Sequence, residues 1–380
     1  MESTGSPGRH SGRTPIRRSQ TRTLTRTAAL FRRRSTFLGE LPIGASSTRP
    51  PRAGITSPDP ASAKGEKIDD MDWAALTRMP AKRIAYRRET YFREGARDTA
   101  RFLGDRAAEI LRQHALLLVK PDGIAAGKVR PVLDWLAEQG FAVQAVQRPE
   151  LDGLRWREMW RYQLTSATVD RLALNDLIYR GSALLLLLRD EQPGPTPATM
   201  RLAALKGSAD LSKQKPGTLR ALLHQHNRNF SYIHVADEPA DLIRELGLLL
   251  EQPQRREALH ALTADTPAGL PLLEEALAVE AAATPRTFDA NTAADAVADA
   301  LKRAEHGNRA LQLMERLRFG ESVPWIEVAE AVAESGAEVD RWDLAAVGAG
   351  LTECDELGEA KLISNPDPAH WAKPRARRPL

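Results

Sequence analysis

The stretch from His114 to Gly140, HALLLVKPDGIAAGKVRPVLDWLAEQG, decides how the chain is built. Its opening residues, His114–Lys120, are a short apolar run stopped by Pro121, a pattern typical of a buried strand. Residues 129–139 then place apolar side chains at helical spacing, and Gly140 ends that pattern. The stretch therefore predicts a strand followed by a helix, the first unit of an α/β fold.

The segments that follow repeat this alternation. Residues 141–146 alternate like a second strand, and Gly181–Leu188 (GSALLLLL) is apolar on both faces, which predicts a central strand. Residues 230–234 predict a short final strand. Helices are expected at 172–177, 200–205 and 239–250, with a polar loop at 211–218. This order predicts an antiparallel sheet of the split-βαβ kind covered by helices.

The rest of the chain divides into four further regions. Residues 1–70 predict a disordered Arg-rich tail, and residues 71–113 a helical lead-in to the α/β domain at 114–252. Residues 253–372 carry Ala-, Leu- and Glu-rich helical patterns without a strand, which predicts an additional all-α C-terminal domain. Residues 373–380 form a short basic tail. The expected class is thus α/β with an added helical domain.

The first sixty residues concentrate the positive charge. They hold 11 Arg, no Lys and three acidic residues, whereas the other 320 residues hold 43 basic and 47 acidic ones. Three interpretations of residues 1–70 remain open: an organelle transit peptide, a basic arm that touches anionic polymers, or an extension upstream of a working start near Met71. Because the excess of positive charge belongs to the tail, nucleic acid is not an expected partner of the folded part.

Composition excludes several classes of protein. The single cysteine, Cys354, rules out an internal disulfide framework and multi-cysteine zinc or iron–sulfur sites. No apolar run reaches the roughly 18–20 residues that span a bilayer, so no membrane association is expected. We expect a cytoplasmic location, with an organelle as the alternative if residues 1–40 are a transit peptide.

Three short motifs carry residues suited to phosphate chemistry. Lys120 follows a buried strand directly, a place where its charge can meet phosphate oxygens. KPGTLR, residues 215–220, is a glycine turn flanked by two cations. His234 ends the last predicted strand, with Asp237 three residues later and Glu245 on the next helix. No GxxxxGK[ST] loop occurs, so a P-loop site is excluded.

Taken together and in this order, the motifs resemble nucleoside diphosphate kinase over about residues 115–252. The resemblance rests on KPDG after an apolar strand, on GSALLL, on KPGTLR, and on the strand-terminal histidine with HxxD and ELGL. It implies a ferredoxin-like α/β sandwich and a ping-pong reaction. In that reaction the γ-phosphate of ATP or another nucleoside triphosphate moves to a histidine and then to a nucleoside diphosphate, with Mg²⁺ bound through the nucleotide phosphates.

The resemblance also implies residue roles. His234 would be the phosphorylated nucleophile, Glu245 would hold its other ring nitrogen, and Asp237 would support the site. Phosphoryl transfer depends on positioning and on neutralising charge, which basic and polar side chains around the phosphates supply. The residues expected to bind the nucleotide are Lys120, Tyr162, Arg201, Arg220 and Asn229. No metal ligand is expected among the protein's own side chains.

Several positions depart from the family pattern, so two hypotheses follow. One is an active but divergent phosphotransferase; the other is a catalytically degenerate kinase-like module that binds nucleotides or acts as a scaffold. The departures are Ser231 in place of an asparagine, Val235-Ala236 in place of Gly-Ser, Asp170 near the position of the aromatic that stacks on the base, Ala209 in place of a threonine, and Ala203 in place of an arginine.

The expected partners follow from the same resemblance. Nucleotides are the small-molecule partners, and family members commonly assemble, so we expect a homo-oligomer. The helical domain at 253–372 has no motif for chemistry, which makes it the expected contact surface for a protein partner.

Overall fold

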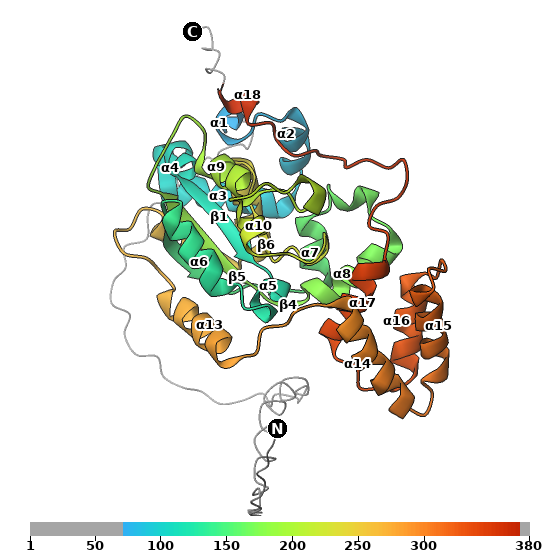
Figure 1. Cartoon of the computed structure of the whole chain (residues 1–380). Coiled ribbons are helices and arrows are strands. Elements are labelled where there is room, and N and C mark those ends of the chain that lie inside the picture. Colours follow the sequence, from blue (N-terminus) through green and yellow to red (C-terminus); the bar gives the residue numbers. More distant parts are fainter. Residues whose placement is uncertain (1–70, 373–380) are drawn as a thin grey trace, which may run out of the picture. The chain divides into compact units, whose positions relative to one another are not determined.

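The computed structural model describes residues 71–372, and its centre is a four-stranded sheet in the order β2-β5-β1-β6 (Figure 1). These strands are β1 (His114–Val119), β2 (Phe141–Gln147), β5 (Leu184–Asp190) and β6 (Ile233–Val235). Every neighbouring pair is antiparallel. This is the predicted antiparallel, ferredoxin-like sheet, and the five leucines of the GSALLLLL segment lie in the central strand β5, whereas its Gly181–Ser182 belong to a separate strand. A separate pair, β3 (Glu150–Leu151) and β4 (Gly181–Ser182), was not predicted.

Helices make up most of the remaining structure between residues 71 and 372. In chain order they are α1 (Trp73–Leu76), α2 (Pro80–Tyr86), α3 (Thr90–Leu103), α4 (Ala107–Gln113), α5 (Pro121–Ala125), α6 (Val129–Glu138), α7 (Gly153–Met159), α8 (Val169–Tyr179), α9 (Ala198–Lys206), α10 (Leu219–Leu222), α11 (Pro239–Leu249), α12 (Gln252–Ala261), α13 (Leu270–Ala282), α14 (Ala290–Arg303), α15 (Asn308–Arg318), α16 (Trp325–Glu334), α17 (Arg341–Leu351) and α18 (Ala369–Ala372). Short 3₁₀ turns lie at Gly104–Arg106, Leu164–Ser166 and Leu211–Lys213.

Alternate residues of the strands point to the two faces of the sheet. Leu117 and Val119 pack into one cluster with apolar residues of α6, α8 and α9. Leu116 and Leu118 pack into the other, with residues of α3, α4 and α11. Successive side chains of a strand point in opposite directions, so a strand that is apolar throughout must be covered on both faces. The sheet is therefore a buried middle layer between two layers of helices.

The approach of α11 to α3 depends on two glycines. A Cβ atom on Gly247 would lie 2.1 Å from the carbonyl oxygen of Tyr91, and one on Gly95 would lie 2.6 Å from that of Ile243. No larger residue fits either position without moving the backbone. The contact fixes α11, the helix that carries Glu245, against the rest of the fold.

Local turns explain where the predicted boundaries are wrong. The helical lead-in expected over residues 71–113 is interrupted at Gly104, whose φ of +55° ends α3 before α4 begins. The last strand starts at Ile233 instead of Phe230, because Tyr232 has a φ of +59° and the Ile233 amide donates to the Ser231 carbonyl at 2.6 Å. This three-residue turn sets the direction in which β6 leaves for the site.

Helices after residue 252 pack against the α/β part in two ways. α12 contacts α3 and β2, and α13 contacts β2 and α6, whereas α14–α17 pack on one another and on α8. A domain boundary at residue 252 stays a prediction, and the predictions for residues 1–70 and 373–380 lie outside the described residues. None of the helices between residues 71 and 372 is long and apolar enough to cross a bilayer.

Candidate functional site

A cavity of about 880 Å³ opens beside the end of β6. Its lining comes from the sheet, from α8 and α9, from the loop before α10, and from the chain after α17. Four of the residues predicted from the sequence lie in it: Lys120, Arg220, His234 and Asp237. Its volume is in the range of small-molecule sites. Motifs that are more than a hundred residues apart in the chain therefore meet around one space.

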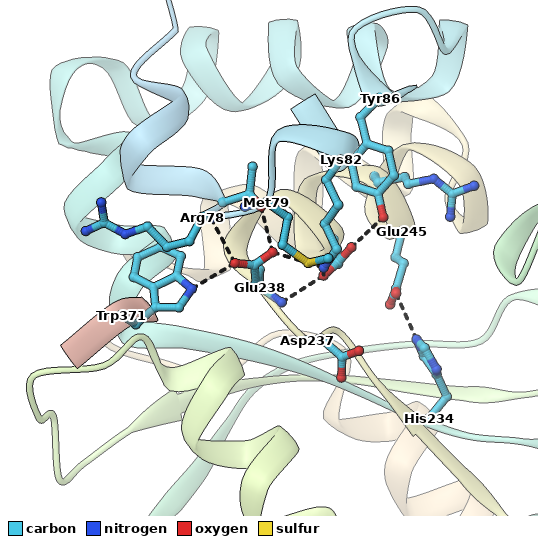
Figure 2. Close-up of polar contacts among 12 residues, drawn as sticks. Arg78, Met79, Lys82, Tyr86, His234, Asp237, Glu238, Glu245 and Trp371 are labelled. Carbon is cyan, nitrogen blue, oxygen red and sulfur yellow. Dashed lines mark hydrogen bonds and ion pairs between the residues drawn. The ribbon is translucent and has the colours of Figure 1, made fainter. Parts of the chain in front are cut away.

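His234 makes two hydrogen bonds that define its proton position. Its Nε2 lies 2.8 Å from Oε1 of Glu245, as Figure 2 shows. Its Nδ1 lies 3.3 Å from the indole Nε1 of Trp160. An indole N–H can only donate, so Nδ1 must accept and the proton of the neutral ring must be on Nε2, facing the carboxylate. The structure thus leaves the lone pair on Nδ1.

Strand β6 and helix α11 hold His234 and Glu245 in position. His234 pairs with Leu118 in the middle of the β1–β6 ladder, and its side chain is 17% exposed. Glu245 lies on the buried face of α11 with 5% of its side chain exposed. A nearly buried carboxylate that bonds one ring nitrogen orients the imidazole, which is a positioning role.

Lys120 lies deep in the site, with only 1% of its surface exposed. Its Nζ is 3.0 Å from Oγ of Ser231, 3.5 Å from Oδ2 of Asp122, and 4.3 Å from the centre of the Tyr179 ring. Burial raises the pKa of Asp122, although the charge of Lys120 opposes this shift. The lysine charge is therefore partly neutralised before any ligand arrives.

Arg220 and Lys206 bring two more cations to the cavity. The guanidinium of Arg220 donates to the carbonyl oxygens of Gly207 and Ile233 at 3.0 and 3.3 Å, and its buried Nε has no partner among the described residues. Burial lowers the pKa of Arg220 to about 10, so the group is charged at neutral pH. Nζ of Lys206 lies 3.3 Å from Oδ1 of Asp237. Burial lowers the pKa of Lys206, with Asp237 acting in the opposite direction.

The charge of the lining is strongly unbalanced. Eight basic residues but only three acidic ones line the cavity. The basic residues are Lys120, Arg171, Lys206, Lys213, Lys215, Arg220, Arg228 and Lys361. Within residues 71–372 no group of three or more His, Cys, Asp or Glu side chains is placed to hold a metal ion. The excess of basic over acidic residues in the lining suits a ligand with several negative charges.

The other predicted nucleotide contacts lie away from this cavity. Tyr162 donates its hydroxyl to Glu89 at 2.6 Å in a buried cluster that also contains Tyr86. Arg201 is paired with Asp190 at 2.8 Å. The Asn229 side chain is buried beside Cys354, where its Nδ2 lies 3.4 Å from the sulfur. The structure does not bring these three side chains to His234.

Several residues that line the cavity were not predicted from the sequence. Trp160 reaches His234, and it is separated from the predicted Tyr162 by one residue in the segment WRY. α7 ends at Met159 and an irregular turn follows, so the register of this segment cannot be read from helical spacing. Lys206 has a clearer signal, since it is the last residue of α9, directly before Gly207.

Comparisons with known proteins find relatives over the part of the chain that carries most of these residues. Residues 113–254 match the family model described as nucleoside diphosphate kinase. The nucleoside diphosphate kinase of a Nocardioides species is 26% identical over 133 residues, which is 35% of this chain and 93% of that protein. The enzyme of that name from Nocardia farcinica is 25% identical over 138 residues, 36% of this chain and 94% of its relative.

Solved structures of the same family were also found. The Aquifex aeolicus nucleoside diphosphate kinase is 20% identical, covers 37% of this chain and 97% of its own, and gives a TM-score of 0.31. That of Halobacterium salinarum, in complex with CDP, is 18% identical, covers 40% and 88%, and gives 0.28. On the family match and the curated relatives, residues 113–254 of this chain form a divergent domain of the nucleoside diphosphate kinase family.

Proposed function

We propose that this domain is a phosphotransferase that moves the γ-phosphate of a nucleoside triphosphate to a nucleoside diphosphate through a phosphohistidine at His234. The observation that carries the proposal is the state of one imidazole. Its Nε2–H faces Glu245, its Nδ1 carries the lone pair, and the charged residues of the cavity that it lines are mainly basic. A neutral imidazole held in one tautomer is a competent nucleophile near neutral pH.

In the first half-reaction Nδ1 of His234 attacks the γ-phosphorus. The bond from that phosphorus to the oxygen bridging to the β-phosphate breaks, and the nucleoside diphosphate leaves with the electron pair. The ring becomes cationic while Nε2 keeps its proton, and Glu245 stabilises that charge across 2.8 Å. In the second half-reaction a terminal oxygen of another diphosphate attacks the phosphorus, and the neutral imidazole returns.

Charge neutralisation falls to the basic lining. Lys120 and Arg220 line the same cavity as His234, and the buried Nε–H of Arg220, which has no partner among the described residues, is a donor suited to a phosphate oxygen. Mg²⁺ supplies further neutralisation when it arrives on the nucleotide phosphates. Asp237 lines the cavity three residues after His234, and its carboxylate pairs with Lys206.

A specific observation favours the second candidate, a degenerate module that binds nucleotides without transfer. Position 231 is a serine that accepts a hydrogen bond from Lys120. Asp170 stands near the position of the aromatic residue that stacks on the nucleotide base in the family, and here it accepts hydrogen bonds from the backbone amides at the start of α16. Each charge-assisted hydrogen bond to phosphate that is lost through a departure from the family pattern weakens phosphate binding by about 1.5–3 kcal/mol. The two candidates differ in whether a covalent intermediate forms.

The test is incubation of the full chain with ATP labelled at the γ-phosphate. We expect an acid-labile phosphoprotein that disappears in His234→Ala and that loses its label when a nucleoside diphosphate is added. His260→Ala, at an exposed position of α12, is the matched control and should label like wild type. A wild-type chain that binds ATP but takes no label would overturn the transferase and support the binding module.

Assembly and location are part of the proposal. We propose nucleotides as partners and a homo-oligomer as the working form, in line with the family. A protein partner for the helical region and a cytoplasmic location also stay predictions.

A further inference from the structure

The chain after α17 returns to the cavity and supplies part of its wall. Residues 352–371, called the C-terminal segment here, run from α17 to α18 (Figure 1). Asp355, Lys361, Asn365, Pro366 and Pro368 of this segment line the cavity. A segment that lies beyond the family match at 113–254 therefore takes part in the candidate active site.

Backbone and side-chain bonds hold the segment at several points. The Glu356 amide donates to the Ser166 carbonyl at 2.7 Å, and the Leu362 amide donates to the Tyr162 carbonyl at 2.9 Å. At the far end, Nε1 of Trp371 donates to Oε1 of the buried Glu238 at 2.7 Å (Figure 2). These hydrogen bonds fix the course of the segment past the cavity.

Asp355 makes the ion pairs between the C-terminal segment and the rest of the cavity lining. Arg171, from α8, lies 2.8 Å from its Oδ1, and Arg228, from the loop before β6, bonds to its Oδ2. All three side chains line the cavity. Two guanidinium groups from distant parts of the chain converge on one carboxylate, the same arrangement that binds a phosphate group.

The carboxylate does not satisfy these cations fully. Nε of Arg171 is buried and has no hydrogen-bond partner within the described part of the chain. Lys361 lines the same region, so three cations share one acid there. A phosphate group, with more oxygens and up to two negative charges, would satisfy more donors than Asp355 can.

We propose that Arg171 and Arg228 form a second anion-binding site of the cavity, suited to a phosphate group, and that Asp355 occupies it until a polyphosphate ligand displaces the C-terminal segment. The ligand class rests on the proposed function; the anion site itself does not require phosphoryl transfer. Ligand binding and docking of the segment are then mutually exclusive, because both need the same two guanidinium groups.

Removing the competing charge should tighten ligand binding. Asp355→Asn keeps the size of the side chain but removes its charge. The side chain at position 355 then occupies the anion-binding site in a smaller fraction of molecules before ligand is added. We expect inorganic tripolyphosphate to bind this variant about five- to tenfold more tightly than wild type. Arg171→Met and Arg228→Met remove the site itself and should weaken binding.

Calorimetry on the full chain tests this with tripolyphosphate in one arm and ATP in the other. Glu359→Gln is the matched control, an exposed carboxylate of the same segment outside the cavity lining, and should bind like wild type. Both ligands should gain equally in Asp355→Asn. Unchanged or weaker binding in that variant would overturn the proposal, and a gain confined to ATP would overturn the assignment to phosphate.

Cys354 allows a second test in which the reporter is a residue of the natural sequence. It is the chain's only cysteine, it precedes Asp355, and it is partly buried against Asn229. Tripolyphosphate should speed its reaction with a soluble disulfide reagent in wild type, and Asp355→Asn should react fast without ligand. Protection by the ligand would contradict displacement. Neither test uses phosphoryl transfer, so they can succeed even if His234 takes no label.

Discussion

At the scale of single residues, the structure gives the two nitrogens of His234 different tasks. Nε2 keeps its proton for Glu245, whereas Nδ1 accepts from Trp160 and carries the lone pair. The bond from Trp160 uses the electrons that the proposed reaction needs, so it must break when Nδ1 attacks phosphorus. Trp160 therefore stabilises the resting histidine and not the transition state.

This predicts an unusual result for Trp160→Phe. The variant keeps an aromatic ring beside Tyr179 and removes the N–H, so the rate of phosphoenzyme formation should stay the same or rise by up to about tenfold. Rapid-quench measurement with labelled ATP gives this rate. Trp156→Phe is the control, because that indole donates to Asp176 outside the cavity and its loss should leave the rate unchanged. A rate lowered a hundredfold in Trp160→Phe would show that the indole acts in the reaction.

Sequence reasoning located the site residues that follow directly from strand ends and glycine turns. Lys120 directly follows β1 and His234 lies in β6, so their positions could be predicted from the strand pattern. Trp160, Arg171 and Arg228 could not, because irregular turns and tertiary contacts decide where they point. A charged residue on a helix or loop usually faces water, and nothing in the sequence marks these two arginines as different.

At the scale of elements, a buried ionic cluster joins α2 to α11 just behind the site (Figure 2). Nζ of Lys82 lies 2.5 Å from Asp241 and 3.0 Å from Glu238, and the three side chains are at most 9% exposed. The hydroxyl of Tyr86 donates to Asp241 at 2.6 Å. The cluster fixes the start of α11 and so helps to place Glu245.

Lys82→Met should destabilise the fold by about 3–5 kcal/mol, because two buried carboxylates lose their cation. Burial alone would lower the pKa of Lys82, but Asp241 and Glu238 outweigh it and hold that pKa well above its usual value. A raised lysine pKa stabilises the fold below the unfolded value of 10.5, and this contribution is lost as pH rises beyond it.

Urea unfolding at pH 9 and pH 11 measures both effects. Wild type should lose more free energy of unfolding between these pH values than Lys82→Met does. Lys302→Met, which breaks an exposed pair with Asp299, should change stability by less than about 0.5 kcal/mol. Equal stability of wild type and Lys82→Met at pH 9 would mean that the cluster contributes nothing to the fold.

Strands and most helices could be predicted because apolar periodicity sets them, as in His114–Val119 and Val129–Glu138. The errors occur where one residue's backbone geometry overrides the pattern. Gly104 and Tyr232 are the examples, since a positive φ ends or delays an element without changing its hydrophobic spacing. The short pair of β3 and β4 has too few residues to show any period.

At the scale of the whole described molecule, one apolar core runs from the sheet into the C-terminal helices. The same cluster contains Leu186 of β5, Leu174 of α8, and Trp325 of α16. Asp170 of α8 also accepts from the first two amides of α16 at 2.8 and 3.0 Å. The helices after residue 289 are thus joined to the kinase-like part by both packing and hydrogen bonds.

Gly348→Ala tests this joint. Its Cβ atom would lie 2.5 Å from the ring of Trp325 and 2.9 Å from Leu174, so the helices must separate. We expect a loss of about 1–3 kcal/mol and one unfolding transition seen alike by circular dichroism and tryptophan fluorescence. Gly350→Ala, on the same helix, meets only Ala290 at 3.2 Å and should have a smaller effect. Two separate transitions in wild type would contradict a shared core.

The central claim is that Nδ1 of His234 attacks phosphorus because Glu245 holds Nε2. Phosphorus NMR of the alkali-stabilised phosphoenzyme distinguishes phosphate on the two ring nitrogens, and isolating the labelled peptide identifies the residue. We expect phosphate on Nδ1 of His234. Phosphate on Nε2, on another residue, or on none after incubation with ATP would contradict it.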